Sequence, residues 1–268
     1  MAGESRVSER PGHLAELACE AARAGIGRLV VVGGDGTVHE VADGLLEAGL
    51  GGDVELGLLP LGTGKDVARS LRIPRRLDTA IDVVRNGRAR TIDVGKATYA
   101  DGTAYFVNFA GAGISGAIAD RANRTTKALG GRLSFLWATV AVFSRWTPSE
   151  MTIEIDGRAQ RRRLHEALAM NGDYTAGGMW IAPEAGADDG LLDVVLIGDF
   201  TKAEFVATFP KIYRGRHVSH PKVEIVRARE LRVSAPSPLP VVLDGEQPGT
   251  TPVTFEIVPR ALRVLVPR

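Results

Sequence analysis

The chain has 268 residues, and 33 Lys and Arg against 32 Asp and Glu give it a net charge of +1 at pH 7. A chain this close to neutral has no global positive field, so we expect no nucleic-acid partner. Its 44% hydrophobic and 24% charged residues are typical of a globular protein of one or two domains. The N-terminal residues lack an apolar leader stretch, which favours a cytoplasmic location.

Helices and strands alternate in the first part of the chain. The two strands, 28–32 and 55–60, are short apolar runs of the type that lies buried inside parallel sheets. Apolar spacing and glycine or proline ends predict the helices, which cover 13–24, 38–48, 66–71 and 77–84. This alternation predicts an α/β domain in which helices cover a parallel sheet.

The remainder of the chain, from Thr91, has a different pattern. Short runs of alternating apolar and polar residues are separated by Gly, Asp and Pro, which predicts a mostly antiparallel β domain. Two helical segments interrupt it, at 127–145 and 202–212. We therefore divide the chain into a first domain of residues 1–96 and a second of residues 97–268. Whether the last strand returns to the first domain is left open.

A glycine-rich loop, within "VVVGGDGTVHEV" at 30–41, separates the first strand from the helix after it. Glycines let the backbone approach a ligand closely, and the N–H groups at the start of a helix favour phosphate. Asp35 then needs a cation or ordered water between its carboxylate and a phosphate. The alternative is an ordinary strand-to-helix turn in which Asp35 and Thr37 only cap the helix.

A second loop, "PLGTGKD" at 60–66, follows the next strand and also begins a helix. Because the carboxyl ends of parallel strands lie at one edge of a sheet, we expect the two loops to converge there. Neither loop has the spacing of a Walker A sequence. Two convergent glycine loops indicate a nucleotide site rather than two unrelated turns.

Together these loops resemble the diacylglycerol kinase catalytic family, which is related to sphingosine kinases and NAD kinases. Two later stretches extend the resemblance, "MNGDYTAGGMWIAPEAGADDGLLDVVLI" at 170–197 and "VVLDGEQ" at 241–247. An NAD kinase shares "GGDGT", but "PLGTGKD" and the late "LDGE" fit the lipid kinases better. The resemblance covers the chain from about Ser8 to the C-terminus.

This resemblance implies a nucleotide-binding α/β domain of the NAD-kinase and diacylglycerol-kinase type, followed by a β-sandwich domain across a cleft. It implies a lipid kinase that moves the γ-phosphoryl group of ATP to the hydroxyl of diacylglycerol or a similar lipid. Glu246 in "LDGE" would be the general base, with Asp35 ordering metal-linked water. The residues implied to contact the nucleotide are Gly33, Gly34, Asp35, Gly36, Thr37, Val38, His39, Thr63 and Ser8.

The stretch "GADDGLLD" at 186–193 resembles the Mg²⁺ loop of the same family. Gly186 and Leu191 would contribute main-chain carbonyls, and Asp189 a side-chain oxygen. Oxygen ligands suit a hard cation, so the implied cofactor is Mg²⁺ beside the substrate ATP. The alternative is a tight turn before a strand, with no metal.

The histidines give little evidence of a site. His39 follows the first glycine loop and is the one we place near the nucleotide. The other four, His13, His165, His217 and His220, we interpret as ordinary surface or cap residues.

The chain departs from the family pattern in two places. The family begins with a strand and an Asn-Pro-x-Ser-Gly loop that this chain lacks, and Ser8 stands where relatives have Thr. Either the start is truncated, which we favour, or the protein is a catalytically impaired relative that binds lipid or nucleotide. Lys65 stands where the family has Asn, which bears on the details of nucleotide binding.

The most apolar segment, 133–143, is shorter than the ~20 residues that a membrane-spanning helix needs. We interpret 133–146, with Trp137 and Trp146, as a buried helix or one that lies at a membrane interface. The expected partner is a lipid substrate at a membrane surface, with peripheral membrane association. A sphingoid-base kinase is the alternative within the enzyme class, and a homodimer is left open.

Overall fold

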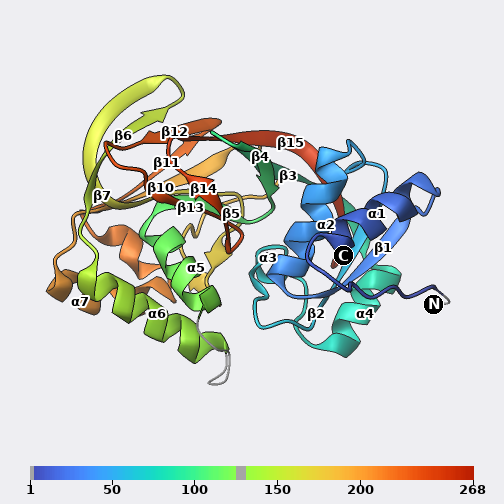
Figure 1. Cartoon of the computed structure of the whole chain (residues 1–268). Coiled ribbons are helices and arrows are strands. Elements are labelled where there is room, and N and C mark those ends of the chain that lie inside the picture. Colours follow the sequence, from blue (N-terminus) through green and yellow to red (C-terminus); the bar gives the residue numbers. More distant parts are fainter. Residues whose placement is uncertain (1–2, 125–130) are drawn as a thin grey trace.

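The computed structural model describes residues 3–124 and 131–268, which form two lobes side by side (Figure 1). The first lobe follows the predicted alternation of helices and strands. Its elements are α1 (His13–Arg23), β1 (Arg28–Gly33), α2 (Asp35–Glu47), β2 (Glu55–Pro60), α3 (Asp66–Ser70) and α4 (Leu77–Asn86). β1 and β2 are parallel, with Gly33 opposite Pro60 at their carboxyl ends, so both glycine loops begin at one edge of the sheet.

Two long strands connect the lobes, β3 (Arg88–Tyr99) and β15 (Val253–Val266). They are antiparallel to each other, and the end of β15 is also parallel to β2, where Arg263 lies opposite Glu55. The start of β15 buries Val253 and Phe255 in the core of the second lobe. Its end buries Leu262, Val264 and Val266 in the core of the first lobe, so one strand belongs to both cores.

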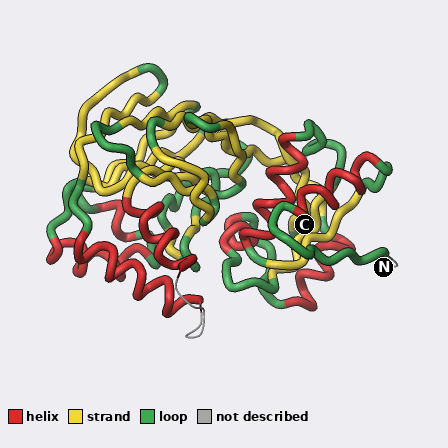
Figure 2. Tube along the Cα trace, in the orientation of Figure 1, coloured by secondary structure: helices red, strands yellow, loops and turns green. Residues whose placement is uncertain are grey.

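The second lobe is a mostly antiparallel β structure with helices along one side (Figure 2). Its strands are β4 (Gly102–Phe106), β5 (Phe109–Gly113), β6 (Ser149–Ile155), β7 (Arg158–Met170), β8 (Tyr174–Thr175), β9 (Met179–Trp180), β10 (Leu192–Gly198), β11 (Val223–Ala228), β12 (Glu230–Ser234), β13 (Pro240–Leu243) and β14 (Glu246–Thr250). Its helices are α5 (Ile114–Arg124), α6 (Gly131–Arg145), α7 (Lys202–Ile212) and the short 3-10 helix Arg216–Ser219. The predicted fold class, an α/β domain followed by a β-sandwich, is confirmed.

Three local predictions differ from the structure. β1, expected to be buried, lies at the edge of the sheet, where Val30 and Val32 are 38% and 53% exposed. α2 begins at Asp35 rather than at Val38, because the helix starts inside the glycine loop. The helix α5 was missed, since it follows β5 directly and the apolar run there was interpreted only as a strand.

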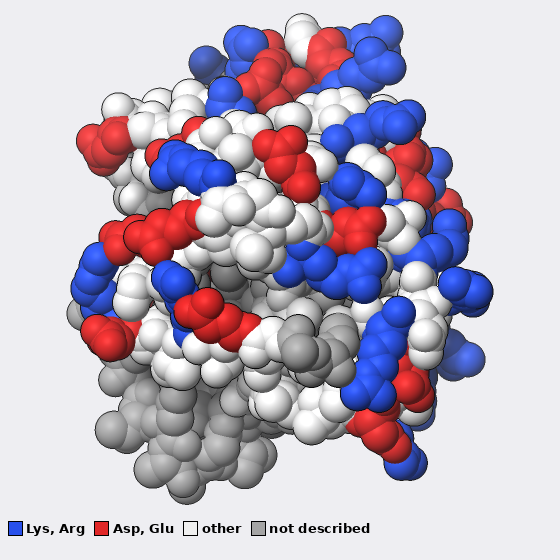
Figure 3. Space-filling view, turned by 90° about the vertical axis from the view of Figure 1, so that its right-hand side faces the viewer, with Lys and Arg blue, Asp and Glu red and all other residues white. Residues whose placement is uncertain are grey.

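The charged side chains of the first lobe do not form a single-sign surface. Figure 3 shows the outer face of the first lobe, where basic side chains run along one side with acidic side chains among them. Among the described residues, no helix is both long and apolar enough to cross a bilayer.

Candidate active site

The two glycine loops are in direct contact through their backbones. Leu61 N donates to Gly33 O at 3.0 Å, and Asp35 N donates to Gly64 O at 3.2 Å. A Cβ on Gly62 would lie only 2.3 Å from Cα of Gly34. A side chain at this point would therefore push the loops apart, and the predicted convergence of the two loops is confirmed.

Asp35 connects the first loop to the helix that follows the second. Its carboxylate accepts hydrogen bonds from Asp66 N at 2.9 Å and Val67 N at 3.0 Å. Burial raises the pKa of Asp35 to about 6, and the neighbouring carboxylates of Asp66 and Asp244 add to the rise, against the effect of the two hydrogen bonds. The side chain thus has a structural role, and it also places a carboxylate beside the start of α2.

A cavity of about 550 Å³ opens between the lobes at these loops. Its mouth is lined by the start of α2, Gly34–Thr37, by Thr63 of the adjoining second loop, and by Glu246 of the second lobe. Its interior lies in the second lobe and is lined mainly by apolar side chains from several elements, among them Ile114, Ile118, Phe143, Leu168, Met179 and Phe205. One space therefore joins a polar, glycine-rich entrance to an apolar interior, which we call the apolar chamber.

Asp244 fixes the position of the "DGE" turn at 244–246. Its buried carboxylate accepts N–H groups of three consecutive residues, Val107 at 2.7 Å, Asn108 at 3.0 Å and Phe109 at 2.9 Å. It also lies 3.3 Å from Nδ1 of His39 on α2. These contacts fix the turn against the start of β5 and against the first lobe at once.

The contact with Asp244 also raises the pKa of His39. Burial alone would lower the pKa of His39, but its hydrogen bond to Asp244 and the charges of Asp244, Asp43 and Glu246 outweigh burial, and the net pKa is raised. A raised pKa favours the imidazolium form, which strengthens the contact with Asp244. His39 therefore bonds to the "DGE" turn and is not one of the residues that line the cavity.

Glu246 extends from the other side of the turn. Its side chain is exposed, and a Cβ on Gly36 would lie 4.0 Å from its Oε1. The carboxylate thus faces the N-terminus of α2 across the mouth of the cavity. Gly34, the residue before α2, has no side chain with which to cap the helix, so this N-terminus stays open to an anion.

The structure brings five of the nine predicted nucleotide residues together with Glu246, the predicted general base. Those that line the cavity are Gly34, Asp35, Gly36, Thr37, Thr63 and Glu246. Val38 is buried in the core of the first lobe, and Gly33 ends β1 just behind the loop. Ser8 lies in an exposed segment and is not among the lining residues. Lys65 is the residue before α3 and does not line the cavity, although both of its neighbours do.

The predicted metal loop lies apart from the cavity. Asp189 accepts a hydrogen bond from Leu191 N at 3.1 Å, and its Oδ2 lies 3.2 Å from where a Cβ of Gly186 would be. Within 3–124 and 131–268, no group of three or more His, Cys, Asp or Glu side chains could hold a metal ion. The Asp189 carboxylate is an oxygen ligand of the kind that suits Mg²⁺, and it lies beside Gly186.

The apolar chamber contains polar side chains that sequence reasoning missed. Glu166 is fully buried and accepts hydrogen bonds from Ser115 N at 2.6 Å and Ser115 Oγ at 2.8 Å. Burial raises the pKa of Glu166 to about 8, against the effect of these two bonds. The only signal in the sequence was a single acidic residue inside an apolar half-strand, "LHEALAM" at 164–170.

Two histidines also lie in this chamber, so their interpretation as surface or cap residues was wrong. His165 and His217 are 2% and 1% exposed. Each donates Nε2–H to a main-chain carbonyl at 3.0 Å, His165 to Phe200 and His217 to Ile181. Burial lowers the pKa of both side chains, which favours neutral imidazoles in the chamber.

Comparison with known proteins gives the family. The description "Diacylglycerol kinase catalytic domain" matches residues 2–97, and "YegS C-terminal NAD kinase beta sandwich-like domain" matches residues 108–266. The chain belongs to the diacylglycerol kinase family. The expected enzyme class, a lipid kinase, is thereby confirmed.

Individual relatives agree with this assignment. A diacylglycerol kinase of Bacillus subtilis is 30% identical over 96% of this chain and 83% of its own length. One of Mycobacterium tuberculosis is 33% identical over 94% of this chain and 81% of its own length. A crystal structure of a diacylglycerol kinase from Bacillus anthracis has a TM-score of 0.71 at 20% identity and covers 97% of this chain and 83% of that one. At that identity the crystal structure supports the fold alone.

The raised pKa of Glu166 predicts a pH-dependent stability. The unfolded chain releases this proton near the ordinary value of 4.5, whereas the folded protein keeps it up to about 8, so the free energy of unfolding falls as pH rises between these values. The Glu166→Gln variant cannot ionise at this position. Above about pH 8 we therefore expect its free energy of unfolding to exceed that of the unmodified protein by a few kcal/mol, at ~1.4 kcal/mol per pKa unit.

Urea denaturation of both proteins at about pH 5 and about pH 9 measures this difference. Glu150→Gln, a change on an exposed strand position, is the matched control and keeps the pH dependence of the unmodified protein. Parallel pH curves for Glu166→Gln and the unmodified protein would contradict the assignment.

Proposed function

We propose that the protein transfers the γ-phosphoryl group of ATP to the hydroxyl of diacylglycerol or a similar lipid. The observation that carries the proposal is the single cavity with a glycine-rich mouth and an apolar interior. A phosphate donor suits the mouth and a lipid tail suits the interior, so their reacting groups would meet near Glu246. Membership in the diacylglycerol kinase family agrees with this division.

The start of α2 is the proposed site of the ATP phosphates. Gly34, Gly36 and Thr37 line the cavity where the helix begins, and the helix N-terminus favours negative charge there. Gly33, Val38 and His39 would contribute through the backbone or by supporting the loop. Thr63 in the second loop would be a further contact. Mg²⁺ bound with the nucleotide would neutralise charge that develops on the phosphates, and Asp35 is placed to order water around it.

Glu246 is the proposed general base. It faces the start of α2 across the mouth, where the lipid hydroxyl would meet the γ-phosphoryl group. The carboxylate takes the hydroxyl proton while the hydroxyl oxygen forms its bond to phosphorus, and the bond from phosphorus to the oxygen of ADP breaks. Asp244 is a positioning residue in this scheme, because its four contacts fix the turn that carries Glu246.

Glu246→Gln tests the base. The amide cannot accept the proton, so we expect phosphoryl transfer to fall by ~10²–10⁴-fold. The measurement uses labelled ATP, Mg²⁺ and diacylglycerol in mixed micelles, with Glu150→Gln as the control that keeps full activity. Full transfer by Glu246→Gln would remove it as the base, and no transfer to any lipid by the unmodified protein would overturn the proposed function.

The loop at Gly186, Asp189 and Leu191 is the proposed site of a structural Mg²⁺. The close approach of Asp189 Oδ2 to Gly186 supports it, since a side chain at 186 would fill the space beside the carboxylate. The loop is already tied to the two long strands by Asp93, which accepts N–H groups of Gly190 and Arg260 at 2.7 Å each. Bound Mg²⁺ would thus stabilise the junction between the lobes.

Mg²⁺ should therefore raise the thermal stability of the unmodified protein and leave Asp189→Ala unchanged. A ligand that binds only the folded state stabilises it by about 2.7 kcal/mol at a hundredfold excess over its Kd. A thermal-unfolding series in MgCl₂, with NaCl of equal ionic strength as the control, measures the shift. Equal shifts for both proteins would place Mg²⁺ elsewhere.

The outer face of α6 and α7 is the proposed contact with a membrane surface. Trp137 and Val140 on α6 are 60% and 51% exposed, and Val206 on α7 is 71% exposed. Phe143 of α6 stacks on Phe205 of α7 at 3.5 Å between ring centroids, so the two helices are packed together. Side chains of 133–136, part of the same predicted segment, lie outside those that the structure describes. The cytoplasmic location and the homodimer stay predictions.

Polar substitutions on this face should weaken membrane binding. Trp137→Ser with Val140→Ser is expected to reduce sedimentation with lipid vesicles several-fold, because apolar area buried in the interface is lost. Activity on short-chain diacylglycerol in solution should be kept, which separates membrane contact from catalysis. Unchanged sedimentation would exclude this face as the contact.

A further inference from the structure

The backbone of β5 is built around the carboxyl group of Glu166. Gly113 lies opposite Glu166 in the β5–β7 pairing, and Gly111 lies two residues before it. A Cβ on Gly111 would be 2.5 Å from Glu166 Oε1, and one on Gly113 would be 3.2 Å from Glu166 Oε2. Gly111 in "GAGIS" at 111–115 thus leaves room for the carboxyl group, whereas a Cβ on Gly113 would first meet the backbone oxygen of His165 at 2.5 Å.

The surroundings of the Glu166–Ser115 pair favour an uncharged acid. None of the described Lys or Arg side chains pairs with Glu166, and the hydrogen bonds from Ser115 are its polar contacts. When Glu166 is protonated, its carboxyl O–H and the O–H of Ser115 are two donors. The hydrogen bond between the two side chains uses one of them, so the other is left over. A ligand in the cavity can take that donor, since Ser115 and Glu166 both line it.

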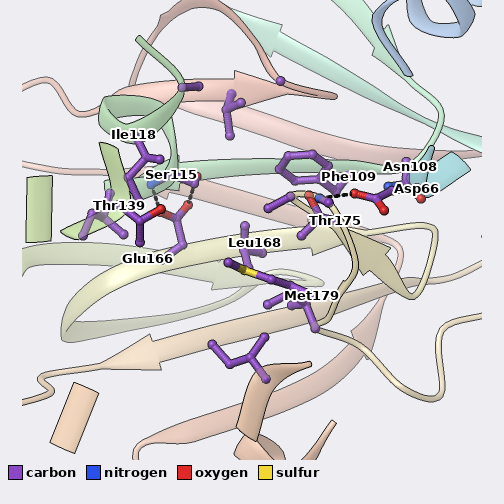
Figure 4. A pocket seen from close by; sticks show the side chains of 18 of the residues that line it. Asp66, Asn108, Phe109, Ser115, Ile118, Thr139, Glu166, Leu168, Thr175 and Met179 are labelled. Carbon is purple, nitrogen blue, oxygen red and sulfur yellow. Dashed lines mark hydrogen bonds between the residues drawn. The ribbon is translucent and has the colours of Figure 1, made fainter. Parts of the chain in front are cut away.

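The pair lies well inside the chamber, away from the mouth. Figure 4 shows Asp66 and Asn108 at one end of the cavity and Glu166 with Ser115 at the other, with Phe109, Leu168 and Met179 between them. The strand order β7, β5, β13, β14 and its register put the Cα atoms of Glu166 and Glu246 about 17 Å apart. Both residues line the cavity, so a ligand held between them spans less than this Cα separation.

An acyl glycerol fits this span. Its free hydroxyl and its farther ester carbonyl are separated by the glycerol backbone and one ester linkage, on the order of 7 Å at ordinary bond lengths. A hydrogen bond at each end brings the total to about 13 Å, which fits within the Cα separation once the two side chains are allowed for. A hydrocarbon chain alone would leave the buried donor without a partner, which costs free energy.

We propose that the Glu166–Ser115 pair recognises an ester carbonyl of the lipid substrate by donating a hydrogen bond to it. This inference rests on the proposed lipid kinase function and names a specificity-determining contact within the same cavity. It favours neutral acyl glycerols over sphingoid bases, because a sphingoid base has no ester carbonyl for this donor and its ammonium group can only donate.

The experiment compares diacylglycerol with dialkylglycerol of the same chain length, which keeps the hydroxyl and the chains but lacks the carbonyls. We expect kcat/KM of the unmodified protein to favour the ester by about tenfold, the usual value of one such hydrogen bond. Glu166→Gln keeps a neutral donor and should keep this preference, whereas Glu166→Met combined with Ser115→Ala removes both donors of the pair and should bring the ratio near one. Mixed ether–ester lipids then identify which of the two carbonyls is bound.

The outcomes separate this inference from the proposed function. If the unmodified protein transfers phosphoryl groups to diacylglycerol without preferring the ester, the inference is overturned and the proposed kinase function stands. This comparison does not depend on the folding of any variant. Preferred transfer to sphingosine that Glu166→Gln abolishes also overturns it, because the pair would then bind a cation. An absence of transfer to every lipid overturns the proposed function and the inference with it.

Discussion

The relation between the two lobes depends on one buried carboxylate. Asp244 accepts hydrogen bonds from three consecutive backbone N–H groups at the start of β5 and contacts His39 on α2. A carboxylate that satisfies this many donors is costly to replace, since each donor left unpaired in a buried place loses its solvation. The same contacts set the direction in which Glu246 leaves the turn. An exposed member of the candidate site is thus positioned by a buried one.

The glycine loops show how the first lobe can present phosphate-binding groups without any basic side chain at the contact. The loops touch backbone to backbone at Gly34 and Gly62, so the space that side chains would take is left to the ligand. Asp35 bonds across the two loops and makes them one unit. Because it is buried among other carboxylates, this unit gains from positive charge nearby. The proposed nucleotide would therefore be held best together with a cation.

Local signals decided which features could be predicted. The helix at 202–212 was predicted with its observed bounds, and the structure shows that a capping box of Thr201 and Glu204 fixes its start. The convergence of the two glycine loops was predicted from strand order alone. The edge position of β1 could not be predicted, since it depends on β15 pairing with β2 from the far end of the chain. Burial of His165 and Glu166 was missed for the same reason, because the elements that cover them are distant in sequence.

The strand β15 has a consequence for how the protein is made. Its last residues, Leu262 to Val266, complete the hydrophobic core of a lobe whose other strands and helices come from the first third of the chain. A domain usually folds as its own segment leaves the ribosome. Here part of the core of the first lobe stays uncovered until the second lobe has been synthesised. The lobe that is synthesised first can thus complete its core only when the last strand of the chain has emerged.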